Sequence, residues 1–186
     1  MEISIIMPTY NPPIKYLEKA IQSIINQTSE KFELIIILDG SNKITENICK
    51  KYKEKDKRIK IYWQKNKGEG GARNTGIEKA TNEWITFIDP DDWLEKDAIE
   101  VMQECFKKTK SQKEKPDIII FDTYINYKNK EEKNEFYTKE GILNNYNKKQ
   151  IQLQNIEQGI CEYYPSKCNV SVAWAKLYQK EFIIKN

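Results

Sequence analysis

The run FELIIIL at residues 32–38 constrains the fold more than any other stretch, because it is apolar at every position except Glu33. A strand with one face in water alternates apolar and polar residues, whereas a strand covered on both faces does not. Covered strands occupy the centre of parallel sheets that carry helices on both faces. The turn-forming residues DGSN follow directly and end the strand. The rest of the chain must therefore supply neighbouring strands and covering helices.

Shorter apolar runs and helical periodicities surround this strand. Further strands are predicted at residues 3–7, 58–63, 84–88 and 117–125. Helices with one apolar face are predicted at residues 14–25, 44–52, 71–80 and 95–108. The alternation predicts an α/β fold, an open and mostly parallel sheet flanked by helices, with a Rossmann-like nucleotide-binding half. We place this core at residues 1–124 and a second region, which includes a helix around residues 173–182, at residues 125–186.

The charge balance argues against a nucleic-acid partner. The 186 residues include 31 basic and 28 acidic side chains, a net charge of only +3, whereas nucleic-acid-binding domains show a clear basic excess. No apolar run reaches the length of a membrane span, and the first residues lack the basic stretch of a signal peptide. We therefore expect a cytoplasmic protein, with peripheral attraction to an anionic membrane surface left open.

The sequence contains no histidine, which removes several kinds of active site. Ser-His and Cys-His nucleophile pairs and His-ligated metals are excluded. The four cysteines lack zinc-type spacing, and we interpret Cys49 and Cys105 as reduced core residues. Any metal must then be held by oxygen atoms, and any general base is expected to be a carboxylate.

Polar residues follow the predicted strands at their carboxyl ends, where open parallel sheets bind ligands. Because these ends lie at one edge of the sheet, side chains from four separate loops are expected to meet there. The candidates are Pro8, Thr9, Tyr10 and Asn11 after the first strand, Asp39 after the second, Asn66, Gly68 and Arg73 after the third, and Asp89, Asp91 and Asp92 after the fourth.

Three carboxylates crowd the end of the fourth strand in the sequence FIDPDDW. Asp89, Asp91 and Asp92 raise one another's pKa unless a cation lies nearby, and a divalent cation relieves their repulsion. Mg²⁺ or Mn²⁺ held by one or two carboxylates takes its remaining ligands from water and from a substrate's phosphates. The alternative is structural: Asp91 or Asp92 caps the amino end of the following helix.

Two further loops add groups suited to a nucleotide. Glycines in NKGEGGARNTG let a ligand approach the backbone, and Arg73 offers donors to phosphate or to the acids. The alternative is a loop–helix junction with Arg73 in solvent, and the spacing matches neither a Rossmann fingerprint nor a P-loop. Asp39 in LDGS is an acceptor for a base or ribose, or else forms an Asx-turn. Together the loops predict a site for a nucleoside diphosphate that carries a transferable group.

The motifs ISIIMPTYN, FELIIILDGS, NKGEGGARNTG, WITFIDPDDW and VAWAKLYQKEFI, in this order, resemble those of family 2 glycosyltransferases of the GT-A fold. The resemblance covers most of residues 2–98 and the final stretch. It implies a nucleotide-sugar donor, most often a UDP-sugar, a requirement for Mn²⁺ or Mg²⁺, and transfer of the sugar with inversion. It also implies a glycan or lipid-linked acceptor, as in polysaccharide biosynthesis.

The resemblance also implies roles for individual residues. Asp39 would contact the uracil, and Arg73 would lie near the base or the diphosphate. Asp91 would bind the metal, with Asp89 as its partner nearer to the ribose. The other nucleotide-binding residues would be Pro8, Thr9, Tyr10, Asn11, Asn66 and Gly68.

Two features depart from the family pattern. The family commonly has two acids in the turn after the second strand, and here the first is Leu38, which puts nucleotide choice in question. In similar proteins the catalytic base is a carboxylate that follows the AWAKLYQKEFI segment by some distance, so we expect it beyond Asn186. Residues 125–186 would then be a partial acceptor-side region, and this chain alone would be inactive or weakly active. Asp122 is the one in-sheet carboxylate left to nominate.

Other functions fit the same residues less well. A non-catalytic nucleotide-sugar-binding module would need the same loops without the base. A sugar-phosphate nucleotidyltransferase carries a glycine-rich loop with a basic residue after its first strand, and PTYNPP has neither. A phospho-acceptor receiver domain also places acids at strand ends, but it has no use for a glycine-rich loop with Arg73.

Overall fold

The computed structural model describes residues 1–109, 116–121, 123–127, 130–134 and 176–185. The chain forms two compact units, one of residues 1–119 with 176–186 and one of residues 120–175. In the second unit, β6 (Thr123–Tyr127) and β7 (Lys130–Asn134) form an antiparallel pair. The candidate site lies in the first unit.

The first unit is built on a six-stranded sheet with the strand order β3-β2-β1-β4-β8-β5. The four strands that lead to the candidate site run parallel, and β8 runs antiparallel to β4. Their bounds are β1 (Ile3–Thr9), β2 (Phe32–Asp39), β3 (Ile59–Gln64), β4 (Trp84–Phe87), β5 (Ile118–Ile120) and β8 (Lys176–Gln179). The predicted α/β fold with a mostly parallel sheet is confirmed.

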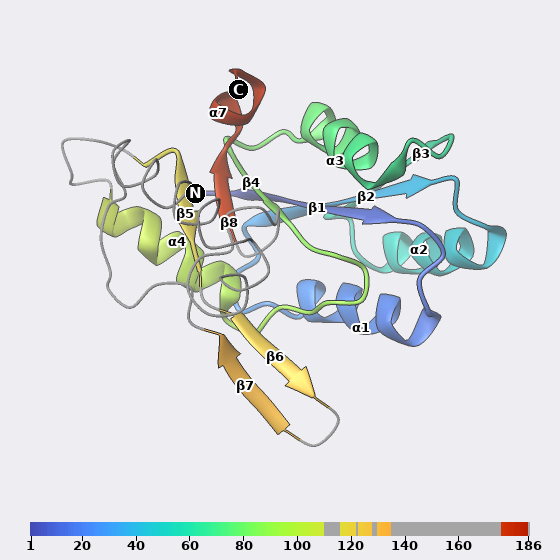
Figure 1. Ribbon diagram of the computed structural model, residues 1–186, viewed down its shortest axis with the longest axis horizontal. Coiled ribbons are helices and arrows are strands. Elements are labelled where there is room, and N and C mark those ends of the chain that lie inside the picture. Colours follow the sequence, from blue (N-terminus) through green and yellow to red (C-terminus); the bar gives the residue numbers. More distant parts are fainter. Residues whose placement is uncertain (110–115, 122, 128–129, 135–175, 186) are drawn as a thin grey trace, which may run out of the picture. The chain divides into compact units, whose positions relative to one another are not determined.

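Helices cover both faces of this sheet. Figure 1 shows α1 and α2 on one face of the parallel strands and α3 on the other. The helices are α1 (Ile14–Ile25), α2 (Lys43–Lys55), α3 (Gly68–Lys79), α4 (Ala98–Thr109) and α7 (Lys180–Lys185). Every residue of β1 and β2 is buried, as expected for strands between two helical layers.

Helix α3 lies unusually close to β1, and a glycine makes this possible. A Cβ atom on Gly76 would collide with the Ile6 side chain of β1. Gly76 and Ala72 are both buried, so the face of α3 that meets the sheet consists of small residues. This close packing fixes the position of α3, and therefore of Arg73, which α3 carries.

One buried carboxylate joins the central strands on the side of α3. Glu33 of β2 is 6% exposed and accepts hydrogen bonds from Ser4 of β1, Thr81 and Lys60 of β3. Burial alone would raise the pKa of Glu33, but the hydrogen bonds from Lys60, Ser4 and Thr81 outweigh it and lower the pKa. Glu33 is thus a structural charge that ties three strands together.

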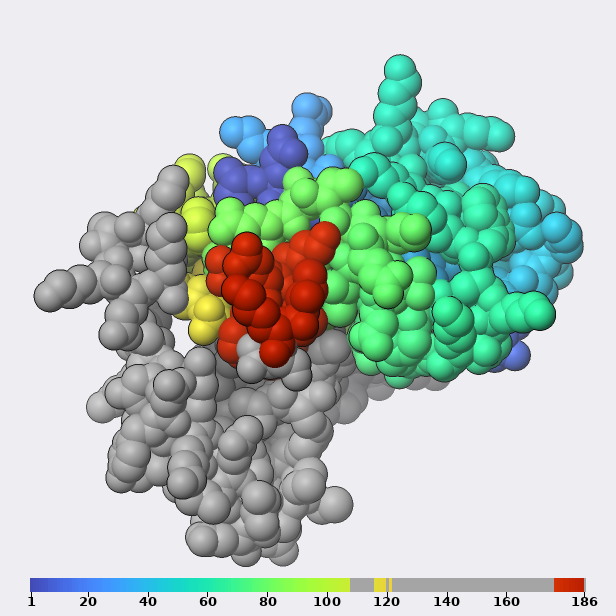
Figure 2. Space-filling model, turned by 90° about the horizontal axis from the view of Figure 1, so that it is seen from above, coloured from blue at the N-terminus to red at the C-terminus, as the bar shows by residue number. Residues whose placement is uncertain are grey.

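The end of the described chain differs from the prediction. A helix was expected around residues 173–182, whereas residues 176–179 form β8 and α7 follows them. In Figure 2 this segment, coloured red, lies against green residues near the start of β4. Lys180 donates from its backbone to the carbonyl of Glu83 and from its side chain to that of Ala80. Pairing with β4 therefore overrides the local helical pattern.

Smaller differences concern element boundaries and the cysteines. The predicted strand at residues 117–125 is divided into β5 and β6, and α3 begins at Gly68 rather than at residue 71. Cys49 is buried in α2 as expected, and burial raises the pKa of its thiol to about 12. No helix in the described part of the chain is long and apolar enough to cross a membrane.

Candidate functional site

The loops after β1 and β2 are joined to each other at the carboxyl edge of the sheet. Ser41 Oγ donates to the carbonyl of Thr9 at 2.8 Å, and the Asn42 backbone N–H donates to Asn11 Oδ1 at 2.7 Å. Asn11 has a φ of 48°, a left-handed conformation that asparagine tolerates better than most residues. These hydrogen bonds hold the two loops together, and the order of the strands had predicted that the loops would be neighbours.

Asp39 lies at the end of β2 and is 3% exposed. Its Oδ1 accepts from Gln64 Nε2 at 2.6 Å and from the Lys67 backbone N–H at 2.8 Å. Both donors belong to the end of β3 and the loop that follows it, so the Asx-turn alternative for Asp39 is wrong. A carboxylate held in this way is a fixed acceptor at the edge of the sheet.

The turn after Asp39 requires a glycine. Gly40 has a φ of 73°, which L side chains rarely adopt. A Cβ at Gly40 would also lie 2.9 Å from Cβ of Asn66, too close for carbon atoms in van der Waals contact. Asn66 in turn accepts from the backbone N–H of Gly68, whose φ is 75°. The two predicted loop residues Asn66 and Gly68 thus shape the wall beside Asp39.

Arg73 connects α3 to the acids after β4. Its Nη2 donates to Asp89 Oδ1 at 3.1 Å and also pairs with Glu69 one turn earlier on α3. The Arg73 side chain is only 21% exposed, so the alternative that places it on a solvated face is wrong. Its Nε is buried and finds no hydrogen-bond partner in the part of the chain that the structure describes.

The three acids occupy a turn and not a helix end. The Asp92 backbone N–H donates to the carbonyl of Asp89 at 3.1 Å, which closes a turn with Pro90 at its second position. Helix α4 begins only at Ala98, so neither Asp91 nor Asp92 caps it. The capping alternative is therefore wrong, and the acids are left for another role.

Burial, together with the neighbouring charges, raises the pKa of two of these acids. Burial raises the pKa of Asp89 most, the Arg73 charge opposes it, and Glu69 and Asp91 raise it further. The pKa of Asp92 rises to about 6, through burial first and then through Asp89 and Asp91. Asp92 is nevertheless open to solvent on one side, so solvent screening limits the energetic effect of its shift. A nearby cation would reverse these shifts.

The acids suit a cation that is shared with a ligand. Asp89, Asp91 and Asp92 offer only oxygen, which Mg²⁺ and Mn²⁺ accept. Among the described residues, however, no three Asp, Glu or Cys side chains lie close enough to hold a metal ion by themselves. The donor set therefore fits a metal only if water or phosphate oxygens complete its coordination.

Helix α3 links the two halves of the site. Its amino end begins beside Asp39, because the Lys67 N–H donates to that carboxylate, and Arg73 reaches Asp89 six residues later. Six residues of helix span about 9 Å. Asp39 and Asp89 follow β2 and β4, which are separated by β1, so the sheet spacing gives about 10 Å as well. The edge thus presents an acceptor and a group of charges about one nucleotide apart.

The remaining predicted residues have different surroundings. Pro8 and Thr9 belong to β1 and are buried, and Thr9 Oγ1 donates to the carbonyl of Met7. Tyr10, by contrast, is 60% exposed at the rim, where an aromatic face is free to stack. Asp122 lies outside the described residues.

Three residues near the site were missed by the sequence reasoning. Gln64 and Glu69 contact Asp39 and Arg73, but a lone Gln or Glu has no distinctive sequence signal. Tyr178 comes from β8, where burial raises its pKa to about 12 and the charge of Arg73 opposes that rise. Its ring meets Phe87 of β4 edge-on at 5.7 Å between ring centres. Only the pairing of β8 with β4 brings Tyr178 to the site.

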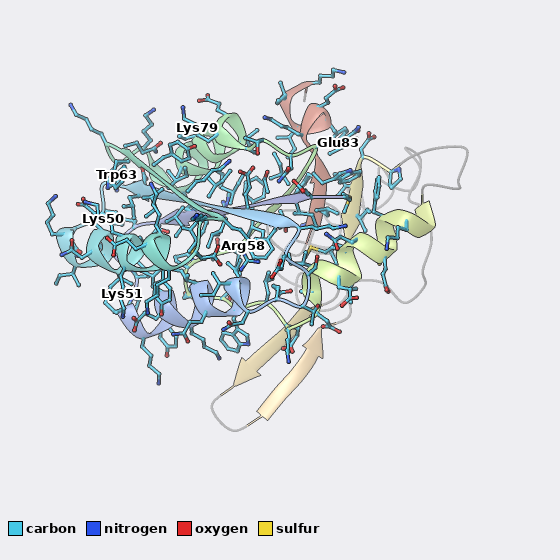
Figure 3. The ribbon with its side chains drawn as sticks, turned by 180° about the vertical axis from the view of Figure 1, so that it is seen from behind. Lys50, Lys51, Arg58, Trp63, Lys79 and Glu83 are labelled. Carbon is cyan, nitrogen blue, oxygen red and sulfur yellow. The ribbon has the colours of Figure 1, made fainter. Side chains whose placement is uncertain are left out.

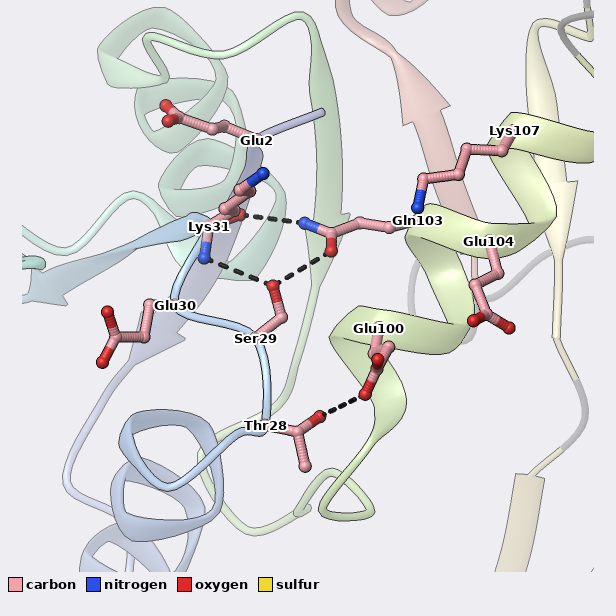
Figure 4. Close-up of a pocket in the computed structure, with 9 residues that line it drawn as sticks. All are labelled: Glu2, Thr28, Ser29, Glu30, Lys31, Glu100, Gln103, Glu104 and Lys107. Carbon is pink, nitrogen blue, oxygen red and sulfur yellow. Dashed lines mark hydrogen bonds between the residues drawn. The ribbon is translucent and has the colours of Figure 1, made fainter.

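A hollow also lies elsewhere in the described structure. Figure 4 shows it between the residues before β2 and helix α4, with a volume of about 690 Å³. Its polar groups bond to one another: Thr28 donates to Glu100, and Ser29 donates to Gln103. Because it lies at the amino ends of the strands and its hydrogen bonds are internal, we assign the ligand site to the carboxyl edge.

Comparison with known proteins identifies the family of the chain. The family model described as glycosyl transferase family 2 matches residues 4–169. The chain belongs to glycosyltransferase family 2. Its relatives include glycosyltransferase GlyA of Streptococcus pneumoniae, 41% identical over 101 residues, which are 54% of this chain and 14% of GlyA. Glycosyltransferase GlyG of the same organism is 33% identical over 126 residues, 67% of this chain and 40% of GlyG. The chain therefore spans less than half the length of these family members.

A similar fold appears among solved structures. S. aureus TarS 1-349 in complex with UDP superimposes with a TM-score of 0.73 at 22% identity, over 100% of this chain and 49% of TarS 1-349. A complex of TarS 1-349 with UDP-GlcNAc gives a TM-score of 0.72 at the same identity, over 100% of this chain and 47% of that chain. At this level of identity the likeness establishes the GT-A-type fold.

Proposed function

We propose that this family 2 domain binds a nucleotide-diphospho-sugar, a UDP-sugar, together with Mn²⁺ or Mg²⁺, and transfers the sugar with inversion. The acceptor would be a glycan or a lipid-linked glycan, as in polysaccharide biosynthesis. The observation that carries the proposal is helix α3, which joins the buried acceptor Asp39 to the Arg73–Asp89 pair at about the length of a nucleotide. The similarity in fold to TarS, whose structures hold UDP and UDP-GlcNAc, supports the choice of ligand.

The base would bind at Asp39. A carboxylate is an acceptor only, so it pairs with a base edge that presents an N–H group, as uracil does at N3. Tyr10 directly follows β1, the strand that pairs with β2, and its exposed ring offers a stacking surface for that base. Pro8, Thr9 and Asn11 shape the neighbouring backbone, and their loops are already tied together without a ligand.

The diphosphate would bind beside Arg73, in the middle of α3. Arg73 is a fork of donors of the kind that recognises phosphate, and its buried Nε is without a partner in the described structure. Asp91 and Asp89 would hold the divalent cation, which when bound stabilises the charge that develops on the leaving diphosphate. Inversion also needs a base that takes the proton of the acceptor hydroxyl, and its place beyond Asn186 stays a prediction.

A peripheral contact with an anionic membrane is proposed for the surface around β3. Residues 43–67 contain ten basic and three acidic side chains. Figure 3 shows Lys50 and Lys51 on α2, with Trp63 on β3 nearby. Trp63 is 52% exposed, and the Lys50 ammonium lies 5.5 Å from its ring centre. Basic groups around an exposed aromatic ring favour an anionic lipid surface. Sedimentation with phosphatidylglycerol vesicles, but not with phosphatidylcholine vesicles, would support this contact.

Calorimetric titration with a panel of nucleotides tests the donor site directly. In the presence of Mn²⁺ we expect UDP to bind, and we expect Asp39→Asn to weaken UDP binding, because an amide fixed by the same donors no longer offers a carboxylate to the base. Glu54→Gln, on the exposed face of α2, is the matched control and should bind UDP like the wild type. A wild-type chain that binds no nucleoside diphosphate would refute the proposed function.

A further inference from the structure

Gln64 supports the turn that carries Asp39 in two ways. It ends β3 directly opposite Asp39 in the strand register. Its side chain Nε2 donates to Asp39 Oδ1 at 2.6 Å, and its backbone carbonyl accepts from the Gly40 N–H at 2.9 Å. The side chain thus lies at the acceptor that the proposed function assigns to the base.

The other end of the Gln64 amide is unsatisfied. Oε1 is buried and accepts no hydrogen bond within the described part of the chain. The amide orientation is set by chemistry, because the reversed amide would press its oxygen against the Asp39 carboxylate. Buried acceptors are nearly always paired. Because Gln64 Oε1 lies beside Asp39, the proposed contact for the base, its missing partner indicates that a bound ligand supplies the donor.

Gln64 also decides which oxygen of Asp39 remains open. Asp39 Oδ1 already receives two hydrogen bonds, from Gln64 and from the Lys67 backbone, and none of the described donors reaches Oδ2. Without Gln64 the carboxylate would be held by the Lys67 N–H alone, which fixes its orientation less well. The pair of contacts therefore leaves one carboxylate oxygen and one amide oxygen for a bound molecule.

We infer that Gln64 is a specificity-determining residue for the nucleobase. It commits one oxygen of Asp39 to the protein and leaves the other for an imino N–H of the base. Its own Oε1 would accept from a ribose hydroxyl, because the imino group is the only N–H of uracil in a nucleoside. The inference rests on the proposed function. Uracil and guanine carry an imino N–H on this edge, whereas cytosine and adenine carry an acceptor nitrogen there. Cytosine or adenine would set its acceptor nitrogen against the open oxygen of Asp39, acceptor against acceptor, which is a strong basis for rejection.

Binding of UDP and CDP to wild type, Gln64→Met and Gln22→Met tests the inference. Methionine keeps the length of the side chain and removes both polar atoms. Gln22 donates to the Tyr52 hydroxyl on the far helices, so Gln22→Met is the same chemical change away from the site. We expect wild type and Gln22→Met to prefer UDP over CDP at least tenfold. Gln64→Met should lose about tenfold in UDP affinity and less in CDP affinity, because both nucleotides lose the contact to Oε1 and only UDP loses the well-placed imino contact to Asp39. It should keep a cooperative thermal transition.

The possible failures are distinguishable. Wild type that binds neither nucleotide overturns the proposed function, and the inference with it. Wild type that binds UDP while Gln64→Met keeps the full preference overturns the inference alone, as does an equal loss in Gln22→Met. If Gln64→Met does not fold, Gln64→Glu replaces it: it keeps the shape, removes the donor to Asp39, and should lose the preference for UDP. An unchanged UDP-to-CDP ratio in that variant would contradict the inference.

Discussion

Replacement of Glu33 by glutamine tests how the parallel strands below the site are held together. The amide oxygen of the variant keeps the three hydrogen bonds that Oε1 accepts, from Ser4 Oγ at 2.6 Å and from Thr81 N and Oγ1 at 2.7 and 2.8 Å. The amide nitrogen, however, replaces the oxygen that accepts from Lys60. The expected loss is therefore one charge-assisted bond and not the whole network.

The size of the loss follows from the exposure of Lys60. A hydrogen bond to a charged group contributes about 1.5–3 kcal/mol. The Lys60 side chain is 39% exposed and is able to turn into water, so it is not left as a buried unpaired charge. We therefore expect Glu33→Gln to cost about 1–2 kcal/mol, which for a chain of this size lowers Tm by about 2–8 °C.

The loss should depend on pH in a defined direction. The pKa of Glu33 is lowered in the folded protein from its ordinary value of 4.5. A depressed acid stabilises the fold above its unfolded pKa, and that stabilisation is lost as pH falls through the folded pKa. Scanning calorimetry from pH 7 down to pH 3 should therefore show the Tm difference between wild type and Glu33→Gln shrink below about pH 4.5. Glu54→Gln should show no difference at pH 7.

Two outcomes would refute this reasoning. A Tm difference that stays constant from pH 7 to pH 3 would mean that the negative charge of Glu33 does not stabilise the sheet. A loss far above 3 kcal/mol at pH 7 would mean that Lys60 is not relieved by solvent and that the pair behaves as a buried ion pair.

Three further substitutions test the geometry of the site by melting temperature and UDP titration. Gly76→Ala would push α3 off Ile6, cost about 1–3 kcal/mol, and weaken UDP binding by displacing Arg73; unchanged stability would contradict the close packing. Gly40→Ala places a side chain at a positive φ and in short contact with Asn66, so it should lower the free energy of unfolding by at least about 1–2 kcal/mol. A variant as stable as the wild type would contradict this reasoning. Arg73→Lys keeps the charge but loses the fork of donors, so we expect UDP affinity to fall about five- to tenfold with little change in Tm; equal affinity would remove Arg73 from the diphosphate site.

The sequence allowed the central sheet and much of the site to be predicted. Apolar runs that lack alternation identify buried parallel strands, and the rule that ligands bind at their carboxyl ends then places Asp39 and Asp89 at one edge. For Arg73 the sequence left two partners open, phosphate or the acids, and the structure shows a contact with Asp89. These predictions depend only on local pattern and on the order of elements along the chain.

The parts that could not be predicted depend on contacts between distant segments. Residues 176–179 read locally as helix, and they form β8 because β4 presents an open edge to them. Tyr178 therefore reaches the site from a segment that local pattern assigns elsewhere. Gln64 was missed for a different reason: its importance comes from an unpaired buried oxygen, which only coordinates reveal. The alternative prediction that Asp91 or Asp92 caps α4 was wrong because the helix begins later than the apolar periodicity suggests.

The most direct test of the proposed donor site is the thermal stability of the chain with UDP, with and without a divalent cation. A ligand that binds only the folded state raises Tm, and at a fixed excess of ligand the rise grows with the logarithm of its affinity. UDP with Mn²⁺ should raise Tm clearly more than UDP with a chelator, and Asp91→Ala should abolish the difference while melting cooperatively on its own. Equal shifts with Mn²⁺ and with chelator would contradict the shared metal–diphosphate site, and no shift in either condition would contradict nucleotide binding altogether.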